Sequence, residues 1–500
     1  MAFFEGILGI ESAEEFSRYI DCNMDDLYSF YNSDYSTIFA SSDDIETVLL
    51  NKIQLISRLN FGNNNVRAFI LISLDLCERL NLISAMPHVY RMISNHNIPL
   101  NSRMKAGICI VYPKPIDAND LISRFEPICD LLQCAIETEE DNQRKSLVTF
   151  LNYYSTVIDA LHPSKSIIIQ NKIQDCLQNQ TYEFLQNIPH LSAIRVNSPN
   201  AYEQVQIIID SINHIGTEQS IRPDKDFHIE ENTEYSEIVN SIGRHITFDS
   251  IREVALRFAD NNRPIGRGVN ITVDEIELFR YLKCYGNMHK AKMLSALDKP
   301  FPQNFNSNVD IIDWGCGQGL ATLIFLEKYG CANVRQITLI EPSVLAIKRA
   351  ALHCKLKAPN TSIRTVCKKL NDIESDDIVS QSSITINLFS NILDIDDYKT
   401  EHLTKIADAI QTDNNYYVCA SPYIDEIKTN KIERFYHHFE QNPSFNLITS
   451  KTNTNDNEYW LCNNTYRTGH INHGGSKYCH PHEANGCSNR WTRVIRVFEV

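Results

Sequence analysis

The sequence predicts an all-α N-terminal domain followed by an α/β C-terminal domain, in which a doubly wound, mostly parallel sheet ends in an antiparallel edge. Three observations carry this prediction. Apolar residues recur at helical spacing from residue 12 to about residue 217. From Val309 onward strand patterns alternate with helix patterns, and the last three segments have strand character only.

Length and composition are those of a globular protein with more than one domain. The 500 residues exceed what a single hydrophobic core usually serves, and 43% of them are hydrophobic against 22% charged. The formal net charge of −15 argues against a globally basic nucleic-acid-binding surface, although a local basic patch stays open. The 15 cysteines are scattered along the chain, which indicates reduced thiols in a cytoplasmic protein.

No segment of the sequence predicts contact with a membrane. Residues 1–6 show no basic region followed by an apolar stretch, so no secretory signal is expected. The most apolar run, residues 69–76, is much too short to span a bilayer.

Residues 1–217 are predicted to form the helical domain. Helical periodicity is clear over residues 43–59, 66–82 and 147–161, and prolines mark where helices end. No fixed repeat length emerges, which favours one ordinary helical domain, although an irregular helical array stays open. Domains of this kind usually recognise other molecules, so a protein or RNA partner is expected here.

Residues 218–300 are predicted to be a connector that ends in a helical cover. One helix is expected at 250–258, and two more, 275–285 and 287–297, are separated by Gly286. They directly precede the first strand of the C-terminal domain, and elements added there often cover the ligand crevice of an open α/β fold. Three polar residues of the last helix either line a substrate entrance or form a solvated face: His289, Lys290 and Lys292.

Residues 301–500 are predicted to form the α/β domain. The expected strands are Val309–Trp314, 336–340, 362–366, 383–388 and 416–420, and the expected helices are Leu320–Tyr329, 343–353, 399–410 and 425–439. Strands joined by helical crossovers pair in parallel. The final segments, 445–450, 458–463 and 492–500, are expected to supply the antiparallel edge.

A glycine-rich turn joins the first of these strands to its helix, and it reads Asp313-Trp-Gly-Cys-Gly-Gln-Gly319. Glycine has no Cβ and tolerates positive φ, so the backbone can approach a ligand closely and direct free N–H groups at it. The dinucleotide fingerprint Gly-x-Gly-x-x-Gly does not fit, because Leu320 and Thr322 stand where the third glycine is required. A nicotinamide oxidoreductase is therefore disfavoured.

The turn resembles the first motif of the class I, Rossmann-like S-adenosylmethionine-dependent methyltransferases, which is an acidic residue, a spacer and Gly-x-Gly-x-Gly. The resemblance concerns the C-terminal part of the chain only. It implies that the turn lies against the methionine and ribose of S-adenosylmethionine and that the acid helps to hold the amino group. The residues assigned in this way are Asp313, Gly315, Cys316, Gly317 and Gly319.

Two further cofactor contacts follow from the same resemblance. Glu341 ends the second predicted strand, where a carboxylate can accept hydrogen bonds from both ribose hydroxyls, and Pro342 would line the adenosine. The alternative for Glu341 is a surface residue that favours the dipole of the next helix. After the third strand, Asn371 or Asp372 stands where family members contact the adenine, although a plain turn explains both nearly as well.

The end of the fourth predicted strand faces the transferred methyl group in this family. Ser390 and Asn391 are therefore expected to orient the methyl acceptor, although a capped turn accounts for them equally well. Enzymes that methylate amino groups of nucleic acids carry Asn/Asp/Ser-Pro-Pro-aromatic here. This chain has no prolines at the position, which weakens the case for base N-methylation.

Cys419, at the end of the fifth predicted strand, invites comparison with the RNA cytosine-C5 methylating enzymes, whose thiolate attacks the base. The partner Pro-Cys motif on the fourth strand is missing. A buried structural thiol is therefore the favoured interpretation.

A stretch rich in histidine and cysteine precedes the last predicted strand. Imidazole and thiolate groups are the ligands that zinc prefers, so a zinc site is a candidate here. Its ligands would be His470, His473, Cys479, His482 and Cys487. The spacing matches no standard finger, and a polar loop is the alternative.

The sequence thus predicts an S-adenosylmethionine-dependent methyltransferase that acts on RNA, a protein or a small molecule. The alternative is a catalytically silent regulatory or scaffold protein that binds S-adenosylmethionine and uses its helical domain to bind a partner. Because Asp313, the glycines and Glu341 favour cofactor binding in both cases, they do not choose between them.

Overall fold

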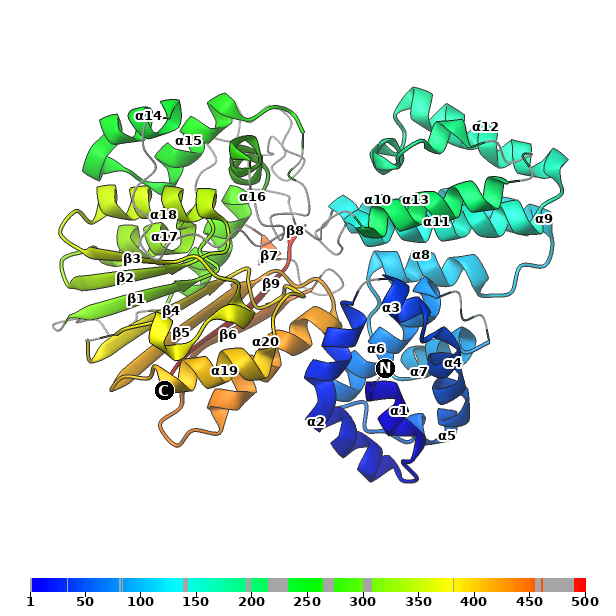
Figure 1. The fold of residues 1–500 in the computed structure, drawn as a ribbon, viewed down its shortest axis with the longest axis horizontal. Coiled ribbons are helices and arrows are strands. Elements are labelled where there is room, and N and C mark those ends of the chain that lie inside the picture. The colour runs from blue at the N-terminus through cyan, green and yellow to red at the C-terminus, as the bar shows by residue number, and fades with distance from the viewer. Residues whose placement is uncertain are drawn as a thin grey trace. The chain divides into compact units, whose positions relative to one another are not determined.

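The computed structural model describes residues 2–33, 35–80, 82, 84–137, 143–194, 198, 200–214, 233–262, 264, 274–299, 308–380, 382–454, 460–461 and 490–500. The chain divides into two units, coloured by residue number in Figure 1. Unit 1 comprises Met1–Glu218 and Ile424–Asn430, and unit 2 comprises Gln219–Tyr423 and Lys431–Val500. No helix among the described residues is both long enough and apolar enough to cross a membrane.

Unit 1 is helical throughout its described residues, as predicted. Its helices are α1 Ala2–Leu8, α2 Ala13–Tyr31, α3 Tyr35–Phe39, α4 Ser42–Asn51, α5 Ile53–Ile56, α6 Asn64–Arg79, α7 Met86–Asn95, α8 Ser102–Val111, α9 Ala118–Ser123, α10 Phe125–Glu137, α11 Gln143–Ala160, α12 Pro163–Asn179 and α13 Ala201–His214. The single helix predicted over 43–59 is wrong, because α4 ends at Asn51 and α5 begins at Ile53. The Lys52 ammonium between them donates to the carbonyl of Ile10 at 2.9 Å, which holds the junction of the two helices against the residues that follow α1.

Two hydrophobic cores adjoin within unit 1, and α8 contributes to both. Ile108 packs into the core formed by the first seven helices, whereas Ala106 and Ile110 face the core formed by α9 to α13. Residues two positions apart on a helix point to different sides, so one helix can serve two cores. The described helices of unit 1 therefore surround two hydrophobic cores, and α8 belongs to both.

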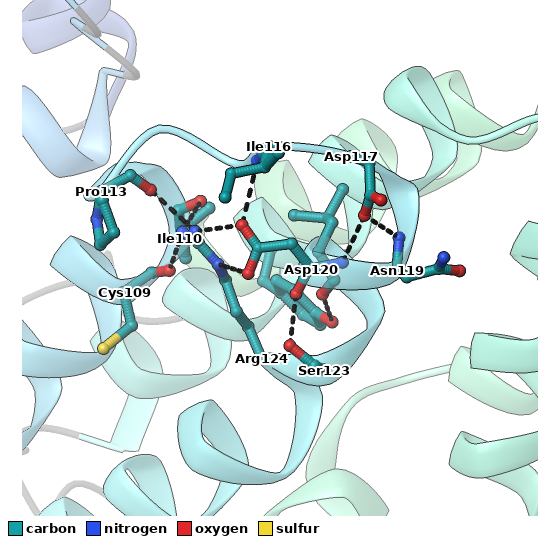
Figure 2. Close-up of polar contacts among 11 residues, drawn as sticks. Cys109, Ile110, Pro113, Ile116, Asp117, Asn119, Asp120, Ser123 and Arg124 are labelled. Atoms are coloured by element: carbon teal, nitrogen blue, oxygen red, sulfur yellow. Dashed lines mark hydrogen bonds and ion pairs between the residues drawn. The ribbon is translucent and has the colours of Figure 1, made fainter.

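A buried arginine fastens the end of α8 to the start of α10 (Figure 2). The Arg124 guanidinium donates to the carbonyls of Cys109 and Pro113, both at 2.8 Å, and forms an ion pair of 2.9 Å with Asp120. Asp120 also accepts the backbone N–H of Ile116 at 3.0 Å. Because the last carbonyls of a helix have no partner within the helix, a guanidinium that binds them stabilises the end of α8.

Unit 2 contains the predicted mixed sheet, which confirms the predicted fold class. Its strands are β1 Val309–Trp314, β2 Val334–Ile340, β3 Ser362–Val366, β4 Ile384–Ser390, β5 Asn414–Ser421, β6 Asn446–Asn453 and β9 Arg493–Glu499. The order is β3-β2-β1-β4-β5-β9-β6, in which β1 to β5 pair in parallel and β9 pairs antiparallel with both β5 and β6. A second, two-stranded sheet joins β7 Trp460–Leu461 to β8 Arg490–Trp491.

Helices cover both faces of the large sheet, as Figure 1 shows. One face packs against α17 Leu320–Tyr329 and α18 Val344–Lys357, on which α14 Glu234–Ile242 and α15 Phe248–Phe258 pack in turn, and the other face packs against α19 Thr400–Ala409 and α20 Glu426–Glu440. Alternate residues of β1 serve the two faces, with Ile311 in one core and Ile312 in the other. A strand buried on both sides needs the continuous apolar run that this sequence has at β1.

The two cover helices predicted around Gly286 are one continuous helix, α16 Glu275–Ala296, so the predicted break is wrong. A glycine does not end a helix by itself, and here its missing side chain has a packing role. A Cβ on Gly286 would lie 3.3 Å from the ring of Phe248 and 3.4 Å from Cδ of Arg252, both on α15. Gly286 therefore lets α15 and α16 approach closely.

Candidate functional site

The glycine turn after β1 has the backbone conformation that its sequence predicts. Gly315, Gly317 and Gly319 adopt φ values of 61°, 50° and 75°, in the left-handed region that side chains disfavour. Gly319 is the N-cap residue of α17, so the turn leads directly into the N-terminus of that helix. The positive end of the helix dipole is located here.

The three glycines differ in what surrounds them. A Cβ on Gly315 would lie 2.5 Å from Cδ1 of Ile392, and one on Gly319 would lie 3.2 Å from Cα of Ala350. A Cβ on Gly317 would meet no described atom within 4 Å. Gly315 and Gly319 are therefore required by the fold of unit 2, whereas Gly317 borders open space.

The carboxylate of Glu341 lies beside this open side of the turn. Its Oε2 accepts the backbone N–H of Gly317 at 3.1 Å, and its Oε1 accepts the N–H of Ser343 at 2.9 Å. Burial raises the pKa of Glu341 to about 7, although both hydrogen bonds act in the opposite direction. Because each carboxylate oxygen can accept more than one hydrogen bond, both retain capacity for a ligand.

Asp313 lies beneath the turn rather than at its surface. Its Oδ2 accepts the hydroxyl of Thr322 at 2.7 Å and the backbone N–H of the same residue at 3.2 Å, and the side chain is 1% exposed. Burial raises the pKa of Asp313 to about 7, the bonds from Thr322 lower it, and the charge of Glu341 adds to the increase. Asp313 thus braces the first turn of α17, a structural contribution that the sequence motif did not suggest.

The other predicted cofactor contacts have structural partners of their own. The amide of Asn371 accepts the N–H of Lys399 at 2.8 Å and lies, with Asp372, exposed in a short 3-10 turn. Pro342 is half-buried and accepts a weak hydrogen bond from the thiol of Cys367 at 3.4 Å. Cys316 is buried, and its backbone N–H donates to the carbonyl of Ile340 at 2.9 Å. Contacts of these residues with a cofactor stay predictions.

The end of β4 lies directly beside the glycine turn. Trp314 of β1 pairs with Phe389 of β4, and the side chain of Ile392 contacts Gly315. Between these contacts, Asn391 has a φ of 57°, and its backbone N–H donates to the carbonyl of Ala420 at 2.8 Å. Asparagine is among the few residues that adopt this conformation at low cost, so β4 stops here and its tip turns.

The side chains at this tip are linked to one another and to α16. The amide nitrogen Nδ2 of Asn391 donates to Oγ of Ser390 at 3.0 Å and to Nδ1 of His289. Nε2 of that histidine is 3.0 Å from the hydroxyl of Tyr281. The buried Oδ1 of Asn391 has no hydrogen-bond partner among the described residues.

Helix α16 crosses the carboxyl ends of the strands. Near its start, Leu278 accepts a hydrogen bond of 3.1 Å from Gln318 in the glycine turn. Its middle reaches the β4 tip through His289, and near its end Ser295 accepts a hydrogen bond of 2.9 Å from Lys451 of β6. In parallel α/β folds this edge of the sheet is where ligands bind, so α16 is placed to cover the site.

The polar residues of α16 do not form a solvated face, which was one of the two hypotheses for them. His289, Lys290 and Lys292 are 8%, 2% and 0% exposed. Lys290 forms an ion pair of 2.8 Å with Asp249 of α15. Helical periodicity could have indicated this: Tyr281, Tyr285 and His289 recur every fourth residue, and their rings contact one another.

The structure bears on the hypothesis of a nucleophilic Cys419, whereas the hypothesis of a zinc site stays untested. Cys419 is buried, and burial strongly raises the pKa of its thiol, which opposes the thiolate that a nucleophilic role requires. The proposed zinc ligands lie outside the described residues, so the zinc site stays a prediction. Within the described ranges no group of three or more His, Cys, Asp or Glu residues is placed to hold a metal ion.

No protein-family model matches the sequence, and no curated protein is significantly similar to it. Several solved structures match in a structural comparison. One is the geranyl diphosphate C-methyltransferase of Streptomyces coelicolor with S-adenosyl-L-homocysteine; the match is 9% identical, covers 54% of this chain and 98% of that one, and has a TM-score of 0.26. Another is a candidate RNA methyltransferase from Pyrococcus horikoshii, with 12% identity, coverage of 49% and 97%, and a TM-score of 0.27.

At these identities and TM-scores the matches say nothing about the reaction of this chain, which has to be inferred from its own residues. With its Gly-x-Gly-x-Gly turn and its mixed seven-stranded sheet, the C-terminal part of the chain resembles the class I S-adenosylmethionine-dependent methyltransferases.

Proposed function

We propose that unit 2 binds S-adenosylmethionine between the glycine turn and Glu341 and transfers its methyl group to an acceptor at the β4 tip. The observation that carries this proposal is the carboxylate of Glu341, which the N–H of Gly317 holds beside the open side of the turn. A pre-positioned, charged acceptor at the end of β2 suits a ribose with two neighbouring hydroxyls.

The donor set fits the cofactor. The conformation of Gly317 leaves space where a backbone can contact a ligand, and Glu341 retains hydrogen-bonding capacity on both oxygens. The carboxylates of Glu341 and Asp313 also bring negative potential to the place where a positively charged sulfonium would be held. Bound S-adenosylmethionine would supply an electrophilic methyl group.

The residues of this chain have four tasks in the proposed reaction. Glu341 would hold the ribose, and Gly317 would allow the backbone to contact the methionine part. Ser390 and Asn391 would orient the acceptor so that its nucleophilic atom approaches the methyl group in line. Helix α16 would exclude water from this edge of the sheet, since it crosses from the turn to β6.

The first test is calorimetric titration of the full chain with S-adenosylmethionine, S-adenosylhomocysteine and NAD. We expect binding of the first two and none of NAD. In Glu341→Ala the affinity should fall by about 1.5–3 kcal/mol, the value of a hydrogen bond to a charged group. Glu253→Ala, which removes an exposed carboxylate on α15, serves as the matched control and should bind normally. Tight binding of NAD alone would overturn the proposal.

A second test separates an enzyme from a silent binding protein. Labelled S-adenosylmethionine would be incubated with the protein and with RNA, protein and metabolite fractions of a crude extract. We expect label in one of these fractions. Normal cofactor binding without transfer to any of them would instead favour a regulatory or scaffold protein.

We further propose that unit 1 selects the acceptor or binds a protein or RNA partner. Its helical packing around two cores supports a recognition role, as in other helical domains. The labelled fraction of the second test would indicate the chemical class of that partner.

A further inference from the structure

A chain of hydrogen bonds connects the cover helix α16 to the strand tip where the acceptor would bind. It runs from Tyr281 through His289 to the amide of Asn391 and on to Ser390. Nδ2 of an asparagine is only a donor, so Nδ1 of His289 must accept. In the neutral ring the proton is then on Nε2, which donates to the hydroxyl of Tyr281.

This arrangement fixes which end of the Asn391 amide remains for a ligand. Both N–H groups of Nδ2 have acceptors, on His289 and on Ser390. Oδ1 is buried and has no partner among the described residues. A buried acceptor without a partner costs about 1–3 kcal/mol, so its occurrence at a left-handed residue beside the glycine turn points to use by a ligand.

We propose that His289 is a positioning residue for methyl transfer: it holds the Asn391 amide so that Oδ1 accepts a hydrogen bond from a proton-bearing nitrogen or oxygen of the methyl acceptor. The inference rests on the proposed function and extends it to the class of acceptor. The acceptor would be an amine, an amide or a hydroxyl compound rather than a carbon nucleophile or a thioether.

The hydrogen bond to Oδ1 would orient the lone pair of the acceptor atom toward the methyl group. The acceptor atom gives this electron pair to the methyl carbon as the bond from that carbon to sulfur breaks, and the electron pair of the broken bond stays on sulfur. The proton of the acceptor passes to water. Neither His289 nor Asn391 has to change its protonation state, because both act through hydrogen bonds.

Substitutions of His289 test the role of each ring nitrogen. His289→Asn places an amide oxygen near the position of Nδ1, which can still accept from Asn391, whereas His289→Gln reaches toward the position of Nε2 and Tyr281. We expect His289→Asn to retain methyl transfer to the labelled fraction within a few-fold. His289→Gln and His289→Ala should each lose at least about tenfold, since a misplaced orienting group can cost about 100-fold.

Substitutions of Asn391 test the role of Oδ1, which has no partner among the described residues. Asn391→Asp keeps an oxygen at Oδ1, and Asn391→Gly removes the side chain in a backbone conformation that glycine adopts freely. We expect the Gly variant to lose transfer and the Asp variant to show reduced transfer, because the second carboxylate oxygen cannot donate to Nδ1 of His289 as Nδ2 does. Each variant is first titrated with S-adenosylmethionine, and an unchanged affinity shows that unit 2 is folded and that the effect is on the acceptor side.

Two results would overturn the inference: activity of His289→Ala equal to that of the unmodified chain, or rescue by Gln as good as by Asn. Cofactor binding without transfer to any fraction would overturn the proposed methyl transfer. Absence of S-adenosylmethionine binding in the unmodified chain would instead overturn the proposed function itself. The two failures are therefore distinguishable.

Discussion

Two carboxylates with raised pKa values dominate the chemistry of the candidate site. Glu341 and Asp313 both have pKa values of about 7, mainly because burial disfavours their charged forms. A group with such a value changes its charge near neutral pH. The affinity of the site for a ribose should therefore depend on pH in the neutral range.

The direction of this dependence follows from hydrogen-bonding roles. Only the ionised Glu341 accepts from both ribose hydroxyls, so we expect S-adenosylmethionine to bind more tightly as the pH rises through about 7. Binding should also release protons, because it stabilises the carboxylate form. Calorimetry in two buffers of different ionisation enthalpy measures this release. In Glu341→Gln the release and the pH dependence should both shrink; if they persist in full, another group is responsible.

For single residues, the sequence predicted the position of Glu341 but not the contacts at the β4 tip. The position of Glu341 at the end of β2 follows from a strand pattern and a motif. The contact between His289 and Asn391 joins residues 102 positions apart, and no local pattern predicts such a pair. The sequence also could not show that Asp313 would bond to Thr322, because both the strand and the helix had to be placed first.

Among the elements, the glycine turn is where substitutions best distinguish an effect on stability from an effect on ligand binding. Gly317 and Gly330 both have positive φ, and a Cβ on either would meet no described atom within 4 Å. Replacing Gly317 by alanine should cost about 1–2 kcal/mol in stability. Replacing Gly330, whose φ of 81° and ψ of 175° lie in a region essentially restricted to glycine, should cost about 1–3 kcal/mol. Only Gly317 lies beside Glu341.

We therefore expect Gly317→Ala to weaken binding of S-adenosylmethionine at least about tenfold, and Gly330→Ala to leave it unchanged. Urea unfolding measures the loss of stability, and calorimetric titration measures the affinity. Equal affinities in the two variants would show that the open side of Gly317 does not contact the cofactor. Gly330→Ala thus controls for backbone strain.

The arginine that joins α8 to α10 makes a prediction about unit 1. Arg124→Ala would leave the carbonyls of Cys109 and Pro113 without their donor, which should destabilise unit 1 by about 2–3 kcal/mol. Arg91 is exposed on α7, so Arg91→Ala is the matched control and should change stability by less than about 0.5 kcal/mol. Unfolding in urea, followed by far-UV circular dichroism, measures both. Equal midpoints would mean that Arg124 contributes no net stability.

At the scale of the whole chain, each unit has its own hydrophobic cores, and the tryptophan residues that can report on unfolding all lie in one unit. All three tryptophans, Trp314, Trp460 and Trp491, belong to unit 2, so tryptophan fluorescence reports on that unit. Far-UV circular dichroism reports on the helices of both units. The two signals can therefore follow different events in one experiment.

We expect saturating S-adenosylhomocysteine to raise the unfolding midpoint observed by fluorescence, since a ligand at 100 times its Kd adds about 2.7 kcal/mol to the state that binds it. The Arg124→Ala change should lower the midpoint observed by circular dichroism and leave the fluorescence midpoint in place. Glu341→Ala, with its weaker binding, should show a smaller ligand shift. A fluorescence midpoint that does not respond to the ligand would contradict a cofactor site in unit 2.

Local patterns were sufficient for most of the architecture. The spacing of apolar residues distinguishes buried strands from amphipathic helices, so β1 and α17 were predicted at their observed bounds. The errors arose where tertiary contacts override local signals. Gly286 lies inside α16, where α15 packs on it, and the helix breaks at Lys52, whose ammonium binds a distant carbonyl.

The sequence by itself determined the fold class and the cofactor motif, because strand and helix periods and the need for positive φ in a turn are properties of neighbouring residues. Only the tertiary structure decided what meets across the carboxyl edge of the sheet. It placed His289 of α16 on Asn391 of β4 and turned Asp313 inward beneath α17. Such contacts depend on how separate elements pack against one another, and this information is distributed over the whole of unit 2.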